Sequence, residues 1–253
     1  MKISKDHPRY RSLVTRERMA AMVDDGIVST TGLIAHGRGE AFDYLLGEVT
    51  VPEADLAERT AAALLLSAKR PVITINGNAA ALAAKELGDL ARATGAQIEI
   101  NLFHRSEERL MKVCDLVERE TGLKVLGREQ DAVLDGIASE RARCTSQGLL
   151  SADVVLIPLE DGDRAEAMAK VGKKVISIDL NPLSRTTLAA DVAVVDELTR
   201  AVPNITRWAN GLKGRPQETM DILSAFRNQE NLAAVMRRMV QGLEKGTADR
   251  SER

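Results

Sequence analysis

The sequence predicts an α/β protein with a Rossmann-like, doubly wound and mainly parallel sheet, to which helices are added at both ends of the chain. Short aliphatic runs such as Val72–Ile75 and Val154–Ile157 alternate with helical patterns over residues 70–213. Strands that are apolar throughout are typical of a parallel sheet covered on both faces. The 253 residues are 44% hydrophobic and only 2% aromatic, so we expect one large aliphatic core.

A helical segment is expected over residues 1–69. Thr15 can cap a helix that ends at Gly26, and Pro52 can open a second helix that reaches Leu66. At the other end of the chain, residues 214–253 are predicted to form a helical tail whose last residues are disordered. Its apolar residues favour one or two amphipathic helices that pack on the core or on a second subunit.

The run Gly32–Leu45 contains two glycines that flank a cation, Gly37-Arg38-Gly39, ahead of an apolar segment. This pattern predicts a glycine-rich loop that offers backbone N–H groups to an anion, with His36 and Arg38 at the binding surface. The alternative is an ordinary loop with a capping glycine.

Between these ends we expect strands and helices in alternation. The expected strands are Val72–Ile75, Ile98–Leu102, Lys124–Leu126, Val154–Ile157, Val175–Ile178 and Val192–Val195. The expected helices are Ala79–Ala93, Ser106–Glu120, Asp131–Arg143, Arg164–Val171 and Asp196–Leu212.

Composition excludes several classes of partner. The formal net charge of −2 gives no reason to expect binding to nucleic acid or to an anionic membrane. No apolar run is long enough to span a bilayer, and Met1–Asp6 lacks the apolar core of a secretion signal, so we expect a cytoplasmic protein. The spacing of Cys114 and Cys144 predicts neither a disulfide nor a zinc site.

Ligands of open α/β sheets bind beyond the carboxyl ends of the strands. After the first strand, Asn76-Gly77-Asn78 keeps one glycine of the dinucleotide fingerprint, which disfavours a nicotinamide or flavin role. After the second strand come Asn101, His104 and Arg105. Arg105 can face the crevice, or it can be a solvated arginine in a capped loop.

The segment Asp179–Thr187 carries groups suited to a nucleotide. Asp179 can accept hydrogen bonds from ribose hydroxyls or help to hold a metal, and Asn181 can contact the edge of a purine. Arg185 and Thr186 suit a phosphate. An unliganded surface turn is the alternative.

Two further acidic positions have competing interpretations. Asp196 can cap the last core helix and leave the amides of Glu197 and Leu198 open for a phosphate, or it can be a purely structural cap. The acidic turn Glu160–Arg164 could bind magnesium, but acid-rich helix starts are common, and we assign no metal ligand.

Four stretches, in order along most of the chain, resemble the archaeal phosphopantothenate synthetases, also called 4-phosphopantoate:β-alanine ligases. They are His7–Leu13, Gly32–Leu45, Ser151–Arg164 and Ile178–Thr186. The resemblance implies a homodimeric, ATP-dependent ligase of coenzyme A biosynthesis. Such an enzyme joins 4-phosphopantoate to β-alanine and releases AMP and diphosphate through a phosphopantoyl adenylate.

The resemblance also implies an ATP site, with Mg²⁺ accompanying ATP as a substrate. Its residues would be Arg16, Arg38, Asp179, Leu180, Asn181, Arg185, Thr186, Glu197 and Leu198. Family members often have Asp-Asn where this chain has Asp196-Glu197. A contact made by the backbone at this place does not depend on that difference.

This chemistry needs cations and no protein nucleophile. Arg38 and Arg185, together with Arg16, would stabilise the charge that develops on the phosphates, and His36 is the candidate to orient or deprotonate the β-alanine amine. For the 4-phosphate, Arg105 with His104 and Asn101 is the best-placed set. Arg9 and Arg141 are alternatives to that set.

Two rival interpretations remain from the residues alone. One is a Rossmann-type oxidoreductase. The other is a non-catalytic nucleotide-binding regulator whose helical tail docks a partner.

Overall fold

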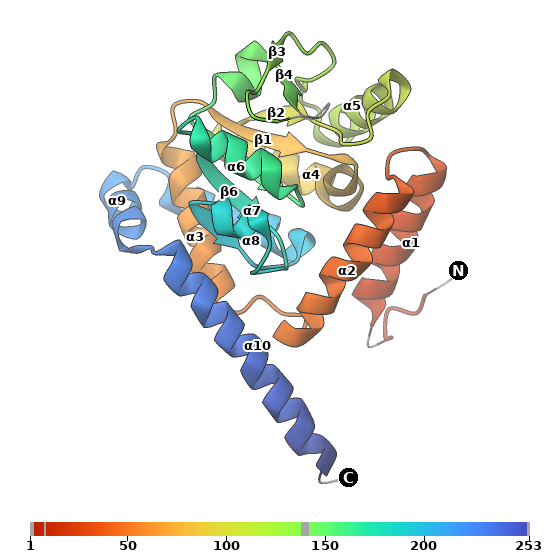
Figure 1. The fold of residues 1–253 in the computed structure, drawn as a ribbon, viewed down its shortest axis with the longest axis vertical. Helices are drawn as coiled ribbons and strands as arrows, with labels where there is room; N and C mark the ends of the chain where they lie inside the picture. Colours follow the sequence, from red (N-terminus) through yellow and green to blue (C-terminus); the bar gives the residue numbers. More distant parts are fainter. Residues whose placement is uncertain (1–2, 8, 138–141, 252–253) are drawn as a thin grey trace.

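A five-stranded parallel sheet forms the centre of the protein, as the computed structural model of residues 3–7, 9–137 and 142–251 describes it (Figure 1). Its strands are β1 (Pro71–Ile75), β2 (Gln97–Ile100), β5 (Val154–Pro158), β6 (Lys174–Ile178) and β7 (Val192–Val194). They lie in the order β2-β1-β5-β6-β7, and each neighbouring pair is parallel. The predicted doubly wound sheet is therefore confirmed. Because the chain winds outward in both directions from β1 and β5, the topological switch point lies between these two strands.

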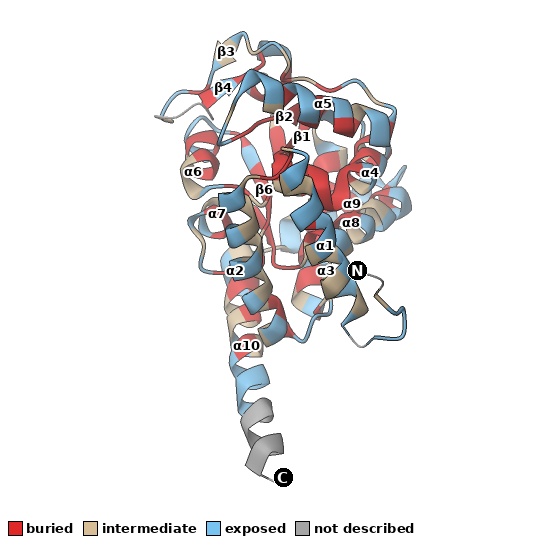
Figure 2. Ribbon diagram, turned by 90° about the vertical axis from the view of Figure 1, so that its right-hand side faces the viewer, coloured by how far each residue is buried: buried red, intermediate tan, exposed pale blue. Residues whose placement is uncertain are grey.

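Helices cover both faces of this sheet. The helices are α1 (Tyr10–Asp24), α2 (Thr30–Leu46), α3 (Pro52–Ser67), α4 (Gly77–Thr94), α5 (Glu107–Thr121), α6 (Gly162–Lys170), α7 (Arg185–Ala189), α8 (Leu198–Leu212), α9 (Pro216–Ala225) and α10 (Asn228–Ser251). Buried residues of α4, α5 and α8 share one aliphatic core with Ile73 and Ile75 of β1. Val72 of the same strand packs in a second core with residues of α6 and α10. Alternate side chains of β1 therefore enter opposite cores, and both faces of the sheet are buried (Figure 2).

The predicted glycine loop is wrong, because Gly37-Arg38-Gly39 lies inside the continuous helix α2. Ser29 caps this helix by accepting a hydrogen bond from the Gly32 amide at 3.1 Å, and Gly47 ends it with a left-handed φ of 84°. Each helical glycine costs about 1 kcal/mol relative to alanine. The caps and the contacts of α2 with α1, α4 and α10 outweigh that cost. Thr15 is likewise no cap, since α1 begins at Tyr10.

The predicted helix over Asp131–Arg143 is also wrong. The structure has the short antiparallel strands β3 (Ala132–Val133) and β4 (Arg143–Cys144), followed by a π-helical turn, η2 (Ser146–Leu150). Residues 138–141, which belong to the same prediction, lie outside the described residues. The Asp131 carboxylate accepts hydrogen bonds from the amide and the hydroxyl of Ser146, at 2.7 and 2.5 Å. This tie between residues distant in the chain favours the hairpin over a local helix. The predicted strand at Lys124–Leu126 is reduced to one bridge between Leu126 and Glu99.

The expected C-terminal helices are present as α9 and α10. Leu232, Val235 and Met239 of α10 are buried against the sheet's second face, and the rest of the helix extends away from the body (Figure 1). The expected disorder concerns the end of the chain, which includes residues 252–253 outside the described part. No described helix is both long enough and apolar enough to cross a membrane. Cys114 and Cys144 are buried, unpaired thiols.

Candidate active site

Three adjoining cavities lie at the carboxyl edge of the sheet. The central cavity, about 310 Å³, is lined by residues of α2 between 35 and 42, by residues 159–162 and 179–186, and by Glu197 and Leu198. The α4 cavity, about 360 Å³, lies around the N-terminal ends of α2 and α4 and shares Asn78 and Leu159 with the central one. The α1 cavity, about 700 Å³, lies between α1, α2 and α8 and shares His36 and Glu197 with the central one.

Asn76 links the ends of β1 and β5 at the switch point by hydrogen bonds. Its side-chain amide donates to the carbonyls of Pro158 and Leu159 at 3.1 and 2.9 Å, while its Oδ1 accepts from the Ala79 amide and caps α4. Leu159, at the end of β5, has a positive φ of 52°. The side chain of Asn76 thus ties the end of β1 to the end of β5 and places the start of α4 at the crevice between them.

The segment after β6 brings most of its predicted residues to the central cavity. Asp179, Leu180, Asn181 and Thr186 all line it. Burial raises the pKa of Asp179, and hydrogen bonds to its carboxylate and the charge of Arg38 oppose that shift. Asp179 Oδ1 accepts from the Asn181 amide at 2.9 Å, so the segment is already ordered by its own hydrogen bonds. Thr186 donates its hydroxyl to the Glu160 carbonyl at 2.8 Å.

Arg185 also lines the central cavity, but its guanidinium is engaged elsewhere. It forms a bidentate pair with Glu166, with Nε–Oε1 and Nη2–Oε2 distances of 2.9 and 2.8 Å. The pair is exposed to solvent, 65% for the Arg185 side chain. An exposed pair contributes about 0–1 kcal/mol, so a multiply charged ligand can displace the carboxylate.

The cap of α8 differs from the prediction. Glu197, not Asp196, is the N-cap, and its carboxylate accepts hydrogen bonds from the amide and hydroxyl of Thr199. The Glu197 amide is not open, because it donates to Asp196 Oδ1 at 2.7 Å. Asp196 is buried and bonds to Arg200 and to the Thr50 hydroxyl, both at 2.6 Å. These contacts to Arg200 and to the distant Thr50 hold Asp196 away from the capping position. Glu197 and Leu198 nevertheless line the central cavity.

Arg38 and His36 both line the central cavity, from the helix α2 instead of the predicted loop. Arg16 does not line it. The Arg16 guanidinium lies against α2, with Nε 3.3 Å from Glu40 Oε2 and Nη2 3.0 Å from the Tyr44 hydroxyl. Glu40 and Tyr44 are one helical turn apart, so a helical α2 presents both of them to α1.

Asn101, His104 and Arg105 were predicted to bind the 4-phosphate of the acid. Among these three described residues, His104 alone lines one of the three cavities, the α4 cavity. Asn101 is buried, and its side-chain amide donates to the Arg143 carbonyl at 2.9 Å. Arg105 forms an ion pair with Glu107 at 2.8 Å. The β3–β4 hairpin, which the sequence did not predict, supplies the partner of Asn101.

Arg109, which sequence reasoning missed, is the arginine in the α4 cavity. Its guanidinium donates to the Ile27 carbonyl from Nε and Nη2, at 3.1 and 2.9 Å, and to the His104 carbonyl at 2.6 Å. These partners are neutral, and burial lowers the pKa of Arg109. A Cβ on Gly77 would lie 2.3 Å from the Ile27 oxygen and 2.6 Å from Arg109 Nη2, so only glycine fits there. Ser106, where the expected helix Ser106–Glu120 starts, accepts from the Arg109 amide and caps α5, so Arg109 lies in the first turn of that helix.

Glu58 of α3 is a fully buried acid next to the site. Burial and the negative charge of Asp196 raise its pKa from 4.5 to about 9. Between these two values the folded protein holds one more proton than the unfolded chain. This group therefore lowers the free energy of unfolding as pH rises, by up to about 1.4 kcal/mol per pH unit.

We therefore expect Glu58→Gln, which keeps the neutral shape, to be more stable than the unsubstituted protein at pH 8 and similar to it near pH 4.5. Urea unfolding at several pH values measures this directly. Stability curves of the two proteins that run parallel from pH 5 to pH 8 would contradict a neutral Glu58.

Comparison with known proteins identifies the family. A family model described as phosphopantothenate/pantothenate synthetase matches residues 53–242, most of the chain. The chain belongs to this family. The resemblance seen in the sequence is thereby confirmed, and the family model covers the sheet and the walls of the central cavity apart from α2.

Relatives within this synthetase family extend the match to the N-terminal helices. A protein from Methanosarcina mazei named 4-phosphopantoate–β-alanine ligase is 46% identical over 248 residues, 98% of each chain. Proteins of the same name from Methanospirillum hungatei and Thermococcus onnurineus are 54% and 44% identical. These two matches cover 83% and 93% of this chain and 86% and 91% of the relatives.

Proposed function

We propose that this protein is an ATP-dependent ligase that condenses 4-phosphopantoate with β-alanine to 4′-phosphopantothenate. It would release AMP and diphosphate and act in coenzyme A biosynthesis. The observation that carries the proposal is the central cavity, which joins Arg38 to the Asp179–Asn181 segment at the switch point of the sheet. The shared name of the relatives supports the same substrates.

ATP fits the central cavity by its chemistry. The Asp179 carboxylate can accept from the ribose hydroxyls, and the Asn181 amide nitrogen can contact the purine, since its oxygen already accepts from Leu183 at 2.9 Å. Arg38 faces the phosphates, and Arg185 joins them when it leaves Glu166. We propose that Mg²⁺ enters with ATP as part of the substrate. Among the described residues, no group of three or more metal-ligating side chains is gathered.

Release of AMP implies two steps. First the acid's carboxylate attacks the α-phosphorus of ATP, an O–P bond forms, and diphosphate leaves. Then the free amine attacks the acyl carbon of the adenylate, the C–N bond forms, and AMP leaves with the electron pair of the broken C–O bond. Neither step uses a protein nucleophile. The protein holds the two anions together and stabilises the negative charge that develops on the phosphorus oxygens and on diphosphate.

The phosphorylated acid fits the α4 cavity. Arg109 and His104 line it. The N-terminal ends of α2 and α4 also open into it, and the first N–H groups of a helix have no carbonyl acceptor within that helix. We therefore propose that Arg109, and not the predicted Arg105, binds the 4-phosphate. In this place the acid's carboxylate can extend into the adjoining central cavity.

The decisive assay follows AMP and diphosphate release by the purified protein with ATP, β-alanine and either 4-phosphopantoate or pantoate. We expect turnover with the phosphorylated acid and little with pantoate. ATP binding without AMP release would support a non-catalytic regulator instead. Bound flavin or nicotinamide, seen by absorbance, would support an oxidoreductase.

Arg109→Gln is expected to raise the KM for 4-phosphopantoate by about tenfold to a hundredfold, because a charged hydrogen bond contributes about 1.5–3 kcal/mol. Activity with pantoate should change little, so discrimination between the two acids falls. Steady-state kinetics with both acids measures this, and Arg109→Lys serves as the charge-retaining control. An equal loss with both acids would instead point to a structural role for the contacts of Arg109 to Ile27 and His104.

We further propose that the enzyme is a cytoplasmic homodimer. Val240 and Leu243 on the extended part of α10 are each 54% exposed, as expected of a helix with apolar surface left for a second subunit. Light scattering of the purified protein measures the oligomeric state, and a mass of one chain at all concentrations would contradict a dimer.

A further inference from the structure

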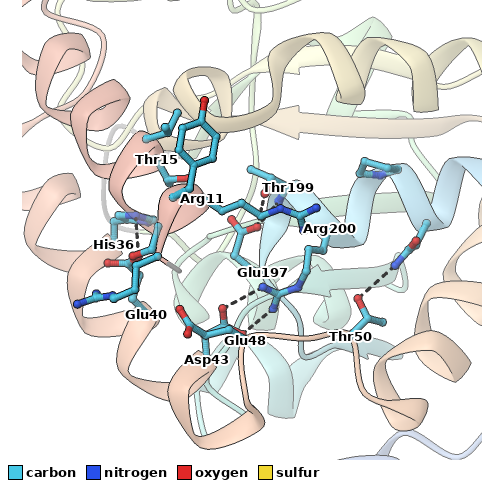
Figure 3. Close-up of a pocket in the computed structure, with 16 residues that line it drawn as sticks. Arg11, Thr15, His36, Glu40, Asp43, Glu48, Thr50, Glu197, Thr199 and Arg200 are labelled. Carbon is cyan, nitrogen blue, oxygen red and sulfur yellow. Dashed lines mark hydrogen bonds and ion pairs between the residues drawn. The ribbon is translucent and has the colours of Figure 1, made fainter. Parts of the chain in front are cut away.

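The α1 cavity is the largest of the three and has no role in the function proposed above. Its walls come from α1, from α2 and from the first turns of α8, and their polar side chains face a common space (Figure 3). Four carboxylates line it, from Glu40, Asp43, Glu48 and Glu197. Asp43 and Glu40 already pair with Arg200 and Arg16. Among the described residues Glu48 and Glu197 are in no ion pair, and their carboxylates can attract a small ammonium compound.

His36 lies in the wall between this cavity and the central one, because it lines both. Its side chain is only 8% exposed, and its Nε2 has no hydrogen-bond partner within the described part of the chain. The nearest acidic oxygen, Glu40 Oε1, is 4.0 Å away (Figure 3). A buried ring nitrogen without a partner costs free energy unless a ligand supplies that partner.

We propose that the α1 cavity binds the amino acid substrate, β-alanine, and that His36 removes a proton from its ammonium group at the opening to the central cavity. The proposal rests on the ligase function given above. In this step the N–H bond of the ammonium breaks, its electron pair stays on nitrogen, and the proton moves to His36 Nε2. The free amine then attacks the acyl adenylate in the central cavity. The attacking nitrogen then carries one proton more than the amide needs, and it releases that proton to water as AMP departs.

The state of His36 suits a base. Burial lowers its pKa, the carboxylate of Glu40 opposes this shift, and the charge of Arg16 on α1 adds to it. Glu197, which faces the same wall from the start of α8, has its own pKa raised by burial. His36 is therefore neutral at pH 7, and Glu40 lies close enough to stabilise the imidazolium that forms.

The carboxylate of β-alanine needs a cation, and the α1 cavity offers one that is not already neutralised. The Arg200 guanidinium pairs with Asp43 and Asp196, each at 2.6 Å. Arg9 donates to the Tyr44 hydroxyl and lies over its ring. Arg11 lines the cavity, and no carboxylate of the described residues pairs with it. We assign Arg11 to the substrate carboxylate.

The test separates the two half-reactions. Exchange of labelled diphosphate into ATP, with 4-phosphopantoate and without β-alanine, reports adenylate formation alone. Amide formation is followed by single turnover after β-alanine is added. We expect His36→Gln to leave the exchange rate within about twofold and to slow amide formation about a hundredfold, within the usual contribution of a general base.

The pH dependence of amide formation gives a readout that a structural role would not produce. Without the base, only the free amine reacts, and an alkylammonium group has a pKa of about 10. The His36→Gln rate should therefore rise about tenfold per unit from pH 7 to pH 9, and its deficit should shrink. Equal losses in both half-reactions, or a deficit independent of pH, would overturn the proposal. Absence of exchange in the unsubstituted protein would overturn the ligase function itself.

Arg11→Gln tests the location of the site. We expect it to raise the KM for β-alanine at least tenfold, with diphosphate exchange unchanged. The matched control is Arg215→Gln. Arg215 is an exposed arginine, far from Arg11 in the sequence, that pairs with Glu218 at 3.3 Å. An unchanged KM for β-alanine in Arg11→Gln would remove the carboxylate contact from this cavity.

Discussion

Replacement of Arg38 by glutamine is expected to slow adenylate formation by about a hundredfold to a thousandfold, the usual loss when one donor to a developing negative charge is removed. Arg38 lies on α2, faces the central cavity, and acts electrostatically on Asp179 across it. In the proposed site the attraction between this guanidinium and the substrate becomes stronger as negative charge builds on the phosphorus oxygens and on diphosphate. The effect should therefore appear in the rate of diphosphate exchange more than in the Kd for ATP.

The matched control for Arg38→Gln is Arg119→Gln on α5, an exposed arginine whose nearest carboxylate, Glu120, is 3.6 Å away. The control should retain full exchange activity. Loss of ATP affinity in Arg38→Gln with an unchanged exchange rate at saturating ATP would show that Arg38 only binds the nucleotide and does not act on the transition state.

Arg164→Met is expected to lower the free energy of unfolding by about 3–5 kcal/mol, the typical cost of removing one member of a buried ion pair. The Arg164 and Glu160 side chains are 0% and 1% exposed, and Nη1 lies 2.7 Å from Oε2. Burial lowers the pKa of Arg164 to about 10, and the carboxylate of Glu99 opposes that shift. Methionine leaves the buried Glu160 carboxylate without this cation, in the wall of the central cavity.

Urea unfolding measures the loss, with Arg119→Met as a surface control that should change stability by less than about 0.5 kcal/mol. A double variant with Glu160→Gln should recover part of the loss, since it removes the unpaired charge. An Arg164→Met protein as stable as the control would mean that the pair contributes nothing to the fold.

Local sequence patterns were sufficient for most of the sheet. Val154–Ile157 and Val175–Ile178 are apolar throughout and lie in β5 and β6, where both faces are buried. Ser106 and Pro52 opened helices where their chemistry predicts it. Such elements are determined by neighbouring residues, so one sequence without a structure is enough to find them.

The errors in prediction have one physical cause. Gly37 and Gly39 suggested a loop, but capping by Ser29 and contacts to three other helices keep α2 continuous. Around residue 131, hydrogen bonds from Asp131 to Ser146 favour a hairpin where the charge pattern predicted a helix. In both places contacts between residues distant in the sequence, together with the local Ser29 cap on α2, outweigh the structure that the local pattern suggested.

In the candidate site, too, some positions follow from local sequence and others from tertiary contacts. Sheet topology alone predicts that Asp179, Asn181 and Arg185 follow a strand end, and the structure places them in one cavity with Arg38. Arg16 pairs with Glu40 and Arg105 pairs with Glu107, and neither arginine lines that cavity. These pairings depend on tertiary packing or side-chain direction. The position of Arg109 at the α4 cavity follows from its contact with the Ile27 carbonyl, 82 residues earlier in the chain.

The sequence by itself determined the parallel sheet, the family resemblance and the strand end that carries Asp179 and Asn181, because each depends on residues close together in the chain. Only the tertiary structure decided that Arg38 lies on a helix, that Arg109 and not Arg105 lines the α4 cavity, and that His36 lines two cavities. Those positions depend on how α1 and α2 pack against the sheet. That packing is the sum of many weak contacts between distant residues, which no local pattern records.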